Sequence, residues 1–165
     1  MKIAIISDIH DQIDRLEWVL SELSQREYEH TFLLGDYCSP FVISKLCAIN
    51  TPINAVWGNN DGDKQTILEI AANHKQPFLF SSTDFNDVIL NNKKYFITHY
   101  PSLAENAALS GKYDAVFHGH LHARKEEMIN DTPIINPGKL ALYPNNEKSF
   151  AIYDTETTKV EFVID

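Results

Sequence analysis

The chain is poor in cysteine, with only Cys38 and Cys47 among 165 residues. Their spacing is not the Cys-x-x-Cys of a zinc knuckle, and two cysteines do not indicate a disulfide framework. No apolar stretch is long enough to cross a bilayer, and the four apolar residues after Lys2 are too few for the core of a signal peptide. We therefore expect a reduced, cytoplasmic protein with no membrane association.

Basic residues are also scarce, since 14 Lys and Arg face 23 Asp and Glu for a net charge of −9. With no Lys- or Arg-rich run, this charge disfavours a nucleic-acid polymer or an anionic membrane as partner. The chain has no repeat, low-complexity tract or linker, and its 44% hydrophobic content is ordinary for a globular protein. We expect one domain over residues 1–165; the sequence leaves open whether copies form a homo-oligomer.

The first half of the chain repeats a strand-loop-helix unit three times. Short apolar runs predict strands at 2–7, 30–34 and 53–57, and apolar periodicity predicts helices at 12–26, 39–49 and 62–73. Asp11 and Ser39 are the predicted N-caps of the first two helices. Such repeated units predict a parallel sheet with right-handed crossovers.

After Pro77 the pattern changes. Strands are expected at 88–90 and 95–98, around the turn residues Asn91 and Asn92, followed by a helix at 102–110 and a strand at 114–117. Four more short strands are expected at 126–129, 132–135, 149–153 and 159–164. The fold class is therefore α/β, with two packed mixed β-sheets flanked by helices.

Five predicted strands end in polar residues. These ends are Asp8-Ile9-His10, Gly35-Asp36, Gly58-Asn59-Asn60-Asp61, His99 and Gly119-His120-Leu121-His122. Because ligands bind at the carboxyl ends of strands in α/β sheets, we expect these segments to converge. Residues two apart point the same way in an extended segment, so Ile9 and Leu121 are expected to face away from the site. The glycines let the backbone turn sharply beside the ligands.

The polar set contains carboxylates, an amide and imidazoles but no thiolate, which suits Mn, Fe, Ni or Zn. Seven donors are too many for one tetrahedral ion, whereas two ions that share a carboxylate use them all. Taken one at a time, Asp8 and Asp36 are equally well explained as turn residues, and His118 as a core histidine. Turn preference does not explain why imidazoles and carboxylates occupy the same end of five strands.

These ordered motifs resemble those of the calcineurin-like metallophosphoesterases. With its short length and the later tripeptide Asn136-Pro137-Gly138, the chain is similar to the small prokaryotic phosphodiesterases of that family. The resemblance implies a four-layer α/β/β/α sandwich and hydrolysis of a small phosphate ester, most simply a diester. It also implies two divalent metal ions, Mn foremost, with a bridging hydroxide as nucleophile. The implied ligands are Asp8, His10, Asp36 and His122 for the first ion, and Asp36, Asn59, His99 and His120 for the second.

The chain departs from this family at Asn60, where many members carry a histidine that protonates the leaving group or holds phosphate. Asn60 can donate a hydrogen bond to substrate but cannot supply a proton near neutral pH. We therefore expect a good leaving group, or water on the metal as the acid. Asp61 is interpreted either as a residue that orients the ligands, as is Asn136, or as a helix N-cap before Gly62.

Other departures leave the natural substrate open among cyclic nucleotides, other nucleotide diesters and phospholipid headgroups. Tyr100 follows His99 where glycine is usual, and Lys139 replaces a common serine. Basic side chains near the motifs, Arg124, Lys125 and Lys139, are either phosphate contacts or solvated surface. Tyr37, Trp57 and Tyr100 are either pocket walls or core.

Two alternatives to the diesterase are a protein-binding scaffold of the same fold and a one-metal hydrolase of another ester. The full donor set argues against a scaffold, which has no need of it.

Overall fold

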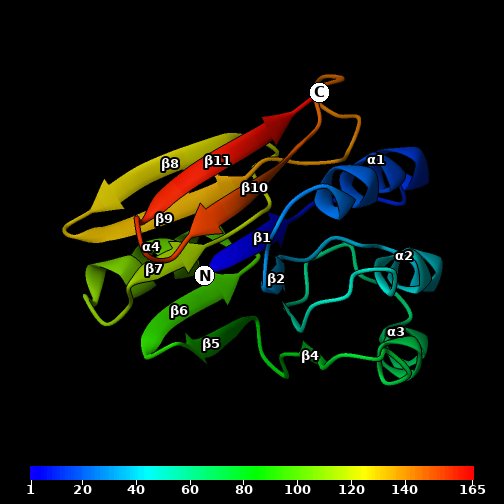
Figure 1. Ribbon diagram of the computed structural model, residues 1–165, viewed down its shortest axis with the longest axis horizontal. Helices are drawn as coiled ribbons and strands as arrows, with labels where there is room; N and C mark the ends of the chain where they lie inside the picture. The colour runs from blue at the N-terminus through cyan, green and yellow to red at the C-terminus, as the bar shows by residue number, and fades with distance from the viewer.

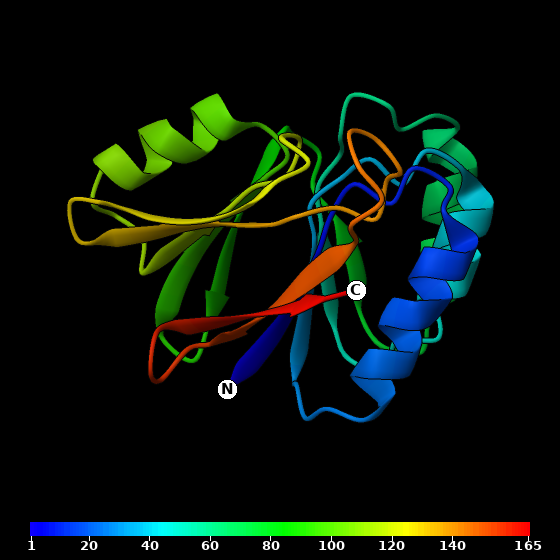
Figure 2. The same cartoon turned by 90° about the horizontal axis from the view of Figure 1, so that it is seen from above.

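The computed structural model describes residues 1–165 as two β-sheets packed face to face between helices (Figure 1). Helices α1 (Ile13–Ser24), α2 (Pro40–Leu46) and α3 (Lys64–Ala71) cover the outer face of one sheet, and α4 (Pro101–Leu109) covers the other. Figure 2 shows these layers edge-on, with α4 on the far side from the other three helices. The predicted α/β fold with two flanked sheets is confirmed.

The first sheet has the strand order β11-β10-β1-β2-β3-β4. Its strands are β1 (Lys2–Ile6), β2 (His30–Leu33), β3 (Ile53–Ala55), β4 (Phe78–Phe80), β10 (Ser149–Asp154) and β11 (Lys159–Ile164). Strands β1 to β4 are parallel neighbours, as the repeated units predict. The three-residue β4 was not predicted, because it is too short to show a period. The β10–β11 hairpin pairs antiparallel with β1.

The second sheet has the order β5-β6-β7-β9-β8. Its strands are β5 (Phe85–Leu90), β6 (Lys93–Thr98), β7 (Ala115–Phe117), β8 (Arg124–Ile129) and β9 (Thr132–Pro137). The three central strands are parallel and both edges are antiparallel hairpins. Asn91 and Asn92 both have positive φ, at 49° and 62°, as a tight hairpin turn requires.

The two faces of β1 are both buried, which explains its unbroken apolar sequence. Ile3 and Ile5 pack into the core between the sheets, while Ala4 and Ile6 pack toward the helices. Burying each isoleucine contributes about 1.5–3 kcal/mol relative to leaving it exposed. The carboxyl end of β1 is therefore held firmly in the middle of the molecule.

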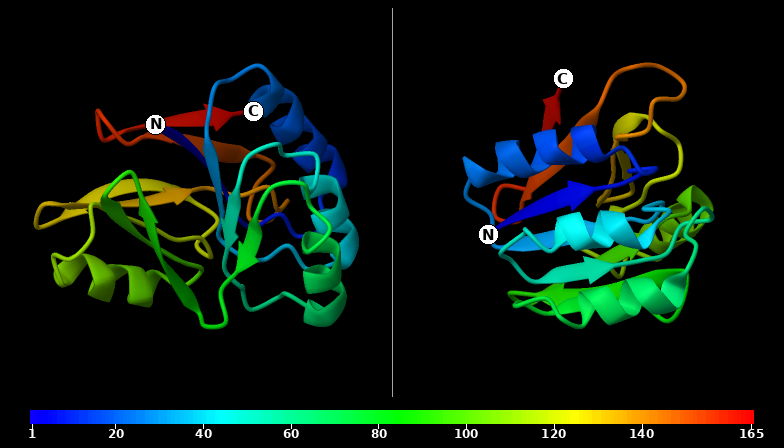
Figure 3. Two further views of the ribbon diagram at one scale, coloured as in Figure 1. Left: turned by 60° about the horizontal axis from the view of Figure 1, so that its bottom comes forward. Right: turned by 90° about the vertical axis from the view of Figure 1, so that its right-hand side faces the viewer.

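The loops after β1 and β2 remain paired beyond the ends of the strands. The amide of Asp8 donates to the carbonyl of Gly35 at 3.1 Å, and that of His10 donates to the carbonyl of Asp36 at 3.0 Å. Figure 3 shows the strand ends and the three helices of this half from two further sides. Main-chain bonds thus set the separation of the two segments that carry the predicted acidic ligands.

The predicted N-cap at Asp11 is wrong, because α1 begins after Gln12. Asp11 has a positive φ of 58°, and its carboxylate accepts a hydrogen bond from Ser39 Oγ at 2.9 Å. Ser39 is the N-cap residue of α2 as predicted, but its hydroxyl serves this contact instead of capping the helix. The two side chains tie the β1–α1 loop to the β2–α2 loop. None of the helices is both long and apolar enough to traverse a membrane.

Candidate metal centre

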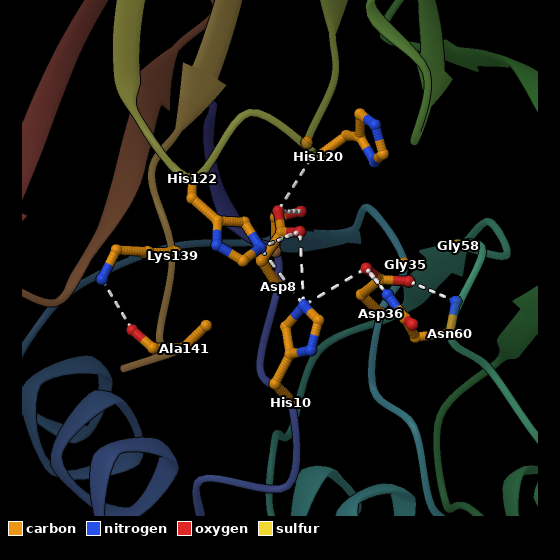
Figure 4. Close-up of polar contacts among 12 residues, drawn as sticks. Asp8, His10, Gly35, Asp36, Gly58, Asn60, His120, His122, Lys139 and Ala141 are labelled. Atoms are coloured by element: carbon orange, nitrogen blue, oxygen red, sulfur yellow. Dashed lines mark hydrogen bonds and ion pairs between the residues drawn. The ribbon is translucent and has the colours of Figure 1, made fainter. Parts of the chain in front are cut away.

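The polar strand ends meet at one edge of the two sheets (Figure 4). All seven predicted ligands lie there: Asp8, His10, Asp36, Asn59, His99, His120 and His122. They follow β1, β2, β3, β6 and β7, so both sheets contribute. A cleft of about 350 Å³ opens beside them.

One group of donors surrounds Asp8 and His10. His122 Nε2 lies 3.3 Å from Asp8 Oδ1 and 3.2 Å from His10 Nε2. His10 Nε2 in turn lies 3.2 Å from Asp36 Oδ2. The donor atoms of Asp8, His10 and His122 all lie within 4.8 Å of one another, which is close enough to hold one metal ion.

A second group lies on the other side of Asp36. His99 Nε2 lies 3.4 Å from Asp36 Oδ2, 3.1 Å from Asn59 Oδ1 and 3.1 Å from His120 Nδ1. The donor atoms of Asp8, Asp36 and His99 also fall within 4.8 Å of one another. Asp36 Oδ2 therefore lies near one imidazole of each group, His10 and His99, and Asp8 belongs to both sets of donors that could hold an ion.

Two of the imidazoles are oriented from behind by backbone carbonyls. His99 Nδ1 lies 2.8 Å from the carbonyl of Leu34, and His122 Nδ1 lies 2.8 Å from the carbonyl of Tyr143. Because a carbonyl only accepts, each Nδ1 carries the proton, and in the neutral ring Nε2 directs a lone pair into the site. These lone pairs face His120 Nδ1 and His10 Nε2 at just over 3 Å, so a proton or a metal cation must lie between the two nitrogens of each pair.

The carboxylate of Asp8 shows the same need for a cation. Its side chain is fully buried, and Oδ1 accepts no hydrogen bond. Oδ2 accepts from Ser7 Oγ at 2.6 Å and from the amide of His120 at 3.0 Å. A buried, unsatisfied carboxylate oxygen costs several kcal/mol unless a positive charge compensates it. Nitrogen and oxygen donors around this atom fit a divalent metal ion.

The electrostatics of the bare site point the same way. Burial acts to raise the pKa of Asp8, but the imidazoles of His10 and His122 outweigh it and lower the pKa to about 2. Burial likewise opposes ionisation of Asp36, yet His10 and His99 hold its pKa well below the usual range. Asp36 and, to a smaller extent, Asp8 raise the pKa of His10 to about 9. Both carboxylates are thus ionised at neutral pH and demand positive charge.

The backbone around these ligands is not extended, contrary to the sequence-based expectation. The φ values are 54° at Asp8, 47° at His10, 56° at Asp36, 72° at His120 and 52° at His122. Left-handed conformations in residues other than glycine cost energy and concentrate at functional sites. Asp8 with His10, and His120 with His122, still aim at one site as predicted, but through local turns and not through an extended backbone.

Ile9 does face away from the site, into the core, but the same prediction for Leu121 is wrong. Leu121 is 48% exposed and lines the cleft, because the left-handed residues on either side turn it toward solvent.

Glycine is required at two positions by close packing against the ligands. A Cβ atom at Gly58 would overlap Asp36 Oδ1, and one at Gly119 would overlap Ser7 Oγ and lie 2.8 Å from Asp8 Oδ2. The main chain of both loops therefore approaches the carboxylates more closely than any other residue type permits.

Asp61 is not a helix N-cap, since Asp63 caps α3. The Asp61 carboxylate instead accepts hydrogen bonds from four backbone amides, those of Asp36 (3.1 Å), Tyr37 (2.6 Å), Cys38 (3.0 Å) and Gly58 (2.7 Å). It lies behind Asp36 and fixes the loop that carries this proposed ligand.

Asn60 faces the site from the rim of the cleft. Its backbone amide donates to Asp36 Oδ1 and its side-chain amide donates to Asp36 Oδ2, both at 2.8 Å. Asn60 thereby holds both oxygens of the carboxylate that the two donor groups share.

Several neighbouring residues turn out to be structural. His118 is buried, with Nδ1 2.9 Å from the carbonyl of Gly119, and Asn136 donates to the same carbonyl at 2.9 Å. Tyr37 is fully buried in the core, and Trp57 stacks on Phe80 at 4.4 Å. Tyr100 packs edge-on against the His99 ring.

The basic side chains near the motifs do not reach the cleft. Lys139 is buried and points away from the donors in Figure 4. Arg124 pairs with Glu147 at 3.3 Å, and Lys125 pairs with Glu127 at 2.8 Å. None of the three lines the cleft.

Sequence reasoning missed Tyr143 and Pro144, which line the same cleft as Asn59 and Asn60. The available signal was an aromatic residue in a polar, turn-rich stretch after the last motif.

Comparison with known proteins agrees with this geometry. The profile of the calcineurin-like phosphoesterase superfamily domain matches residues 1–158. Phosphodiesterase MJ0936 of Methanocaldococcus jannaschii is 33% identical over 166 residues, 99% of both chains. A solved archaeal phosphodiesterase superposes with a TM-score of 0.92 at 33% identity over the full length of both chains. The Escherichia coli phosphoesterase YfcE has a TM-score of 0.71 at 20% identity, covering 99% of this chain and 98% of its own, and shows the fold alone.

The fold, the converging donors and these similarities lead to one conclusion: the chain belongs to the calcineurin-like phosphoesterase superfamily and is a metal-dependent phosphoesterase.

Proposed function

We propose that the protein hydrolyses small phosphodiesters with two divalent metal ions, Mn foremost and Fe, Ni or Zn as alternatives, and with a hydroxide that bridges them as nucleophile. The observation that carries this proposal is the position of Asp36. Its Oδ2 lies 3.2 Å from His10 Nε2 and 3.4 Å from His99 Nε2, so one carboxylate serves two donor groups.

The ions, when bound, would activate water at neutral pH and neutralise charge on the phosphoryl oxygens. The chain supplies the ligands and their orientation. Asp8, His10, Asp36 and His122 are the proposed ligands of one ion, and Asp36, Asn59, His99 and His120 those of the other. Asp61 positions Asp36 through the backbone amides that it accepts.

Asn60 is the proposed substrate contact. One N–H of its side-chain amide is used on Asp36 Oδ2, and the second remains for a phosphoryl oxygen. An amide does not release a proton near neutral pH, so Asn60 is not the acid for the leaving group. The site therefore favours esters whose leaving group departs without protonation by a side chain.

The walls of the cleft favour a diester over a monoester. Its lining contains no lysine or arginine, so no side chain matches the second negative charge of a monoester. The net charge of −9 also repels long polyanions at a distance, which excludes a nucleic-acid polymer as substrate in our proposal. Cys38 and Cys47 are free thiols, which fits the proposed cytoplasmic location.

Hydrolysis of bis(para-nitrophenyl) phosphate and of para-nitrophenyl phosphate tests this function. The protein is first stripped with a chelator, then assayed alone and with added Mn²⁺, while bound metal is counted by elemental analysis. We expect hydrolysis of the diester to exceed that of the monoester and to require metal, with two ions per chain.

One ion per chain would instead support the one-metal hydrolase. Hydrolysis of neither ester by protein that binds metal would support the scaffold.

A further inference from the structure

The loop formed by residues 139–148 carries an exposed aromatic side chain to the edge of the candidate metal centre. Tyr143 is 79% exposed and lines the same cleft as His10 and Asp36. Leu121 and Pro144 line this cleft too. We call Leu121, Tyr143 and Pro144 the apolar platform. Exposed apolar residues are common singly, but three that share one cleft with a metal centre are typical of a ligand site.

Two buried cations hold this loop in place. Lys139 is 3% exposed and Arg15 is 9% exposed, and neither pairs with a carboxylate. Both side chains donate to carbonyl oxygens of the loop instead. Lys139 Nζ donates to Ala141 (2.6 Å), Asn145 (2.7 Å) and Glu147 (3.0 Å), and Arg15 donates to Leu140 (3.2 Å), Ala141 (3.2 Å), Asn146 (3.0 Å) and Glu147 (3.4 Å). Burying a cation is costly unless its hydrogen bonds are satisfied, so these contacts order the loop.

The loop is also bonded directly to the metal centre. His122 Nδ1 donates to the carbonyl of Tyr143 at 2.8 Å. The amides of Leu140 and Ala141 both donate to the carbonyl of Asp8, at 3.0 and 2.9 Å. The main chain beside Tyr143 is therefore fixed relative to two proposed ligands. With the main chain fixed, only the side-chain torsions of Tyr143 remain to be ordered when a ligand binds, which favours affinity.

We propose that the apolar platform binds a planar aromatic ester group of the substrate, a nucleobase or an aryl ring, while the phosphate lies at the donors. This inference rests on the proposed phosphodiesterase function and narrows its substrate class. Rings stack on tyrosine, whereas a glycerol group offers no face to stack. Quaternary ammonium groups are typically held by cages of several aromatic rings, and the platform has one. The cleft volume of about 350 Å³ suits a single small ligand.

Two diesters with the same leaving group test the platform: the para-nitrophenyl ester of thymidine monophosphate, and methyl para-nitrophenyl phosphate. Kinetics of the Mn²⁺-loaded wild type are compared with those of Tyr143→Ala, Tyr143→Phe and the control Leu142→Ala. Leu142 is equally part of the loop and is exposed, but it does not line the cleft. We expect Tyr143→Ala to raise KM for the thymidine ester about tenfold with little change in kcat, because stacking contributes to binding and not to the chemical step. Tyr143→Phe and Leu142→Ala should match wild type.

An equal rise in KM for both esters would also support the platform, with the nitrophenyl ring as its occupant. Unchanged KM for both esters in Tyr143→Ala would overturn it. If wild type hydrolyses neither ester, the proposed function fails, and calorimetric binding of adenosine monophosphate and glycerol phosphate to the Mn²⁺-loaded protein then tests the platform alone. Tighter binding of adenosine monophosphate that Tyr143→Ala abolishes would support it, and equal affinities would overturn it.

Discussion

The two sheets contribute different chemistry to the candidate metal centre. The first sheet supplies both carboxylates and the amide, from Asp8, Asp36 and Asn59, together with His10; the second sheet supplies only imidazoles, from His99, His120 and His122. The carboxylates are almost completely buried and held by backbone bonds, whereas His120 is exposed and His122 is partly exposed. Neither sheet alone assembles a complete ligand set, so the site exists only where the sheets pack together.

This contrast predicts that losing a carboxylate harms the site more than losing an imidazole. Asp36→Asn removes the charge shared by both donor groups. We expect a rate loss on the order of 10³-fold with bis(para-nitrophenyl) phosphate, since a metal ion contributes several kcal/mol of transition-state stabilisation. Metal analysis should show fewer than two ions per chain. The surface variant Asp87→Asn, whose partner is Lys94, is the control and should match wild type. Full metal content and full activity in Asp36→Asn would refute a shared carboxylate.

The second sheet is tested by His120→Ala, which removes one imidazole and no carboxylate. We expect a smaller loss, about 10²-fold, that excess Mn²⁺ partly restores because Asp36, Asn59 and His99 remain. Activity measured across a Mn²⁺ titration checks this. His74→Ala removes an imidazole that contacts backbone carbonyls elsewhere and should leave the titration unchanged. A loss in His120→Ala as large as that of Asp36→Asn would contradict the ranking of the two sheets.

A residue that only positions a proposed ligand of the first sheet should affect activity less than either of these ligands does. In Asp61→Asn one acceptor oxygen becomes an amide that faces backbone N–H groups, which disturbs the loop carrying Asp36. We expect metal affinity to fall about tenfold, as is typical when a residue that orients a ligand is lost. A Mn²⁺ titration should recover most of kcat at saturation. Asp63→Asn is the matched control, because asparagine caps a helix as well as aspartate. An unchanged titration curve for Asp61→Asn would remove this residue from the site.

The smallest effect expected is a release of protons on metal binding. Imidazoles and carboxylates should contribute unequally to this release. The pKa of His10 is raised to about 9 by Asp36 and Asp8, so His10 is protonated in the metal-free protein at neutral pH. It must lose this proton to bind metal, whereas Asp8, with its pKa lowered to about 2, is already ionised. Release is therefore present at neutral pH and disappears as pH rises through about 9.

Calorimetric titration of Mn²⁺ in two buffers of different ionisation enthalpy measures this release. We expect His10→Gln to release fewer protons than wild type at neutral pH, because glutamine has none to lose. Identical binding enthalpies in the two buffers would show that no proton leaves.

The sequence predicts the parts of this site that depend on strands. Apolar runs such as Ile3–Ile6 identify β1, and polar residues at the strand ends identify the candidate ligands. It does not predict the left-handed backbone of His120 and His122, because that conformation depends on contacts with distant segments such as the bond from the amide of His120 to Asp8. The same holds for Tyr143, whose loop is held by Arg15 from the other end of the chain. The observed helix ends lie within a few residues of the predicted ones. Asp11 and Asp61, in contrast, make tertiary contacts that no local sequence pattern reveals.

The loops after β1 and β2 remain paired beyond the ends of their strands, and this pairing also bears on which metal the protein binds in a cell. Asp8 lies opposite Gly35 on the neighbouring segment, so Asp8 and Asp36 are one inter-strand step, about 4.8 Å, and one residue apart, a separation that backbone amides and carbonyls define. These backbone bonds form without any ion, and the oxygen and nitrogen donors of the site suit several first-row divalent metals. We therefore expect the metal supply of the cell and its growth medium, and not the polypeptide, to decide which metal is bound. Protein prepared from manganese-rich and from zinc-rich cultures should differ in metal content while keeping the same backbone structure.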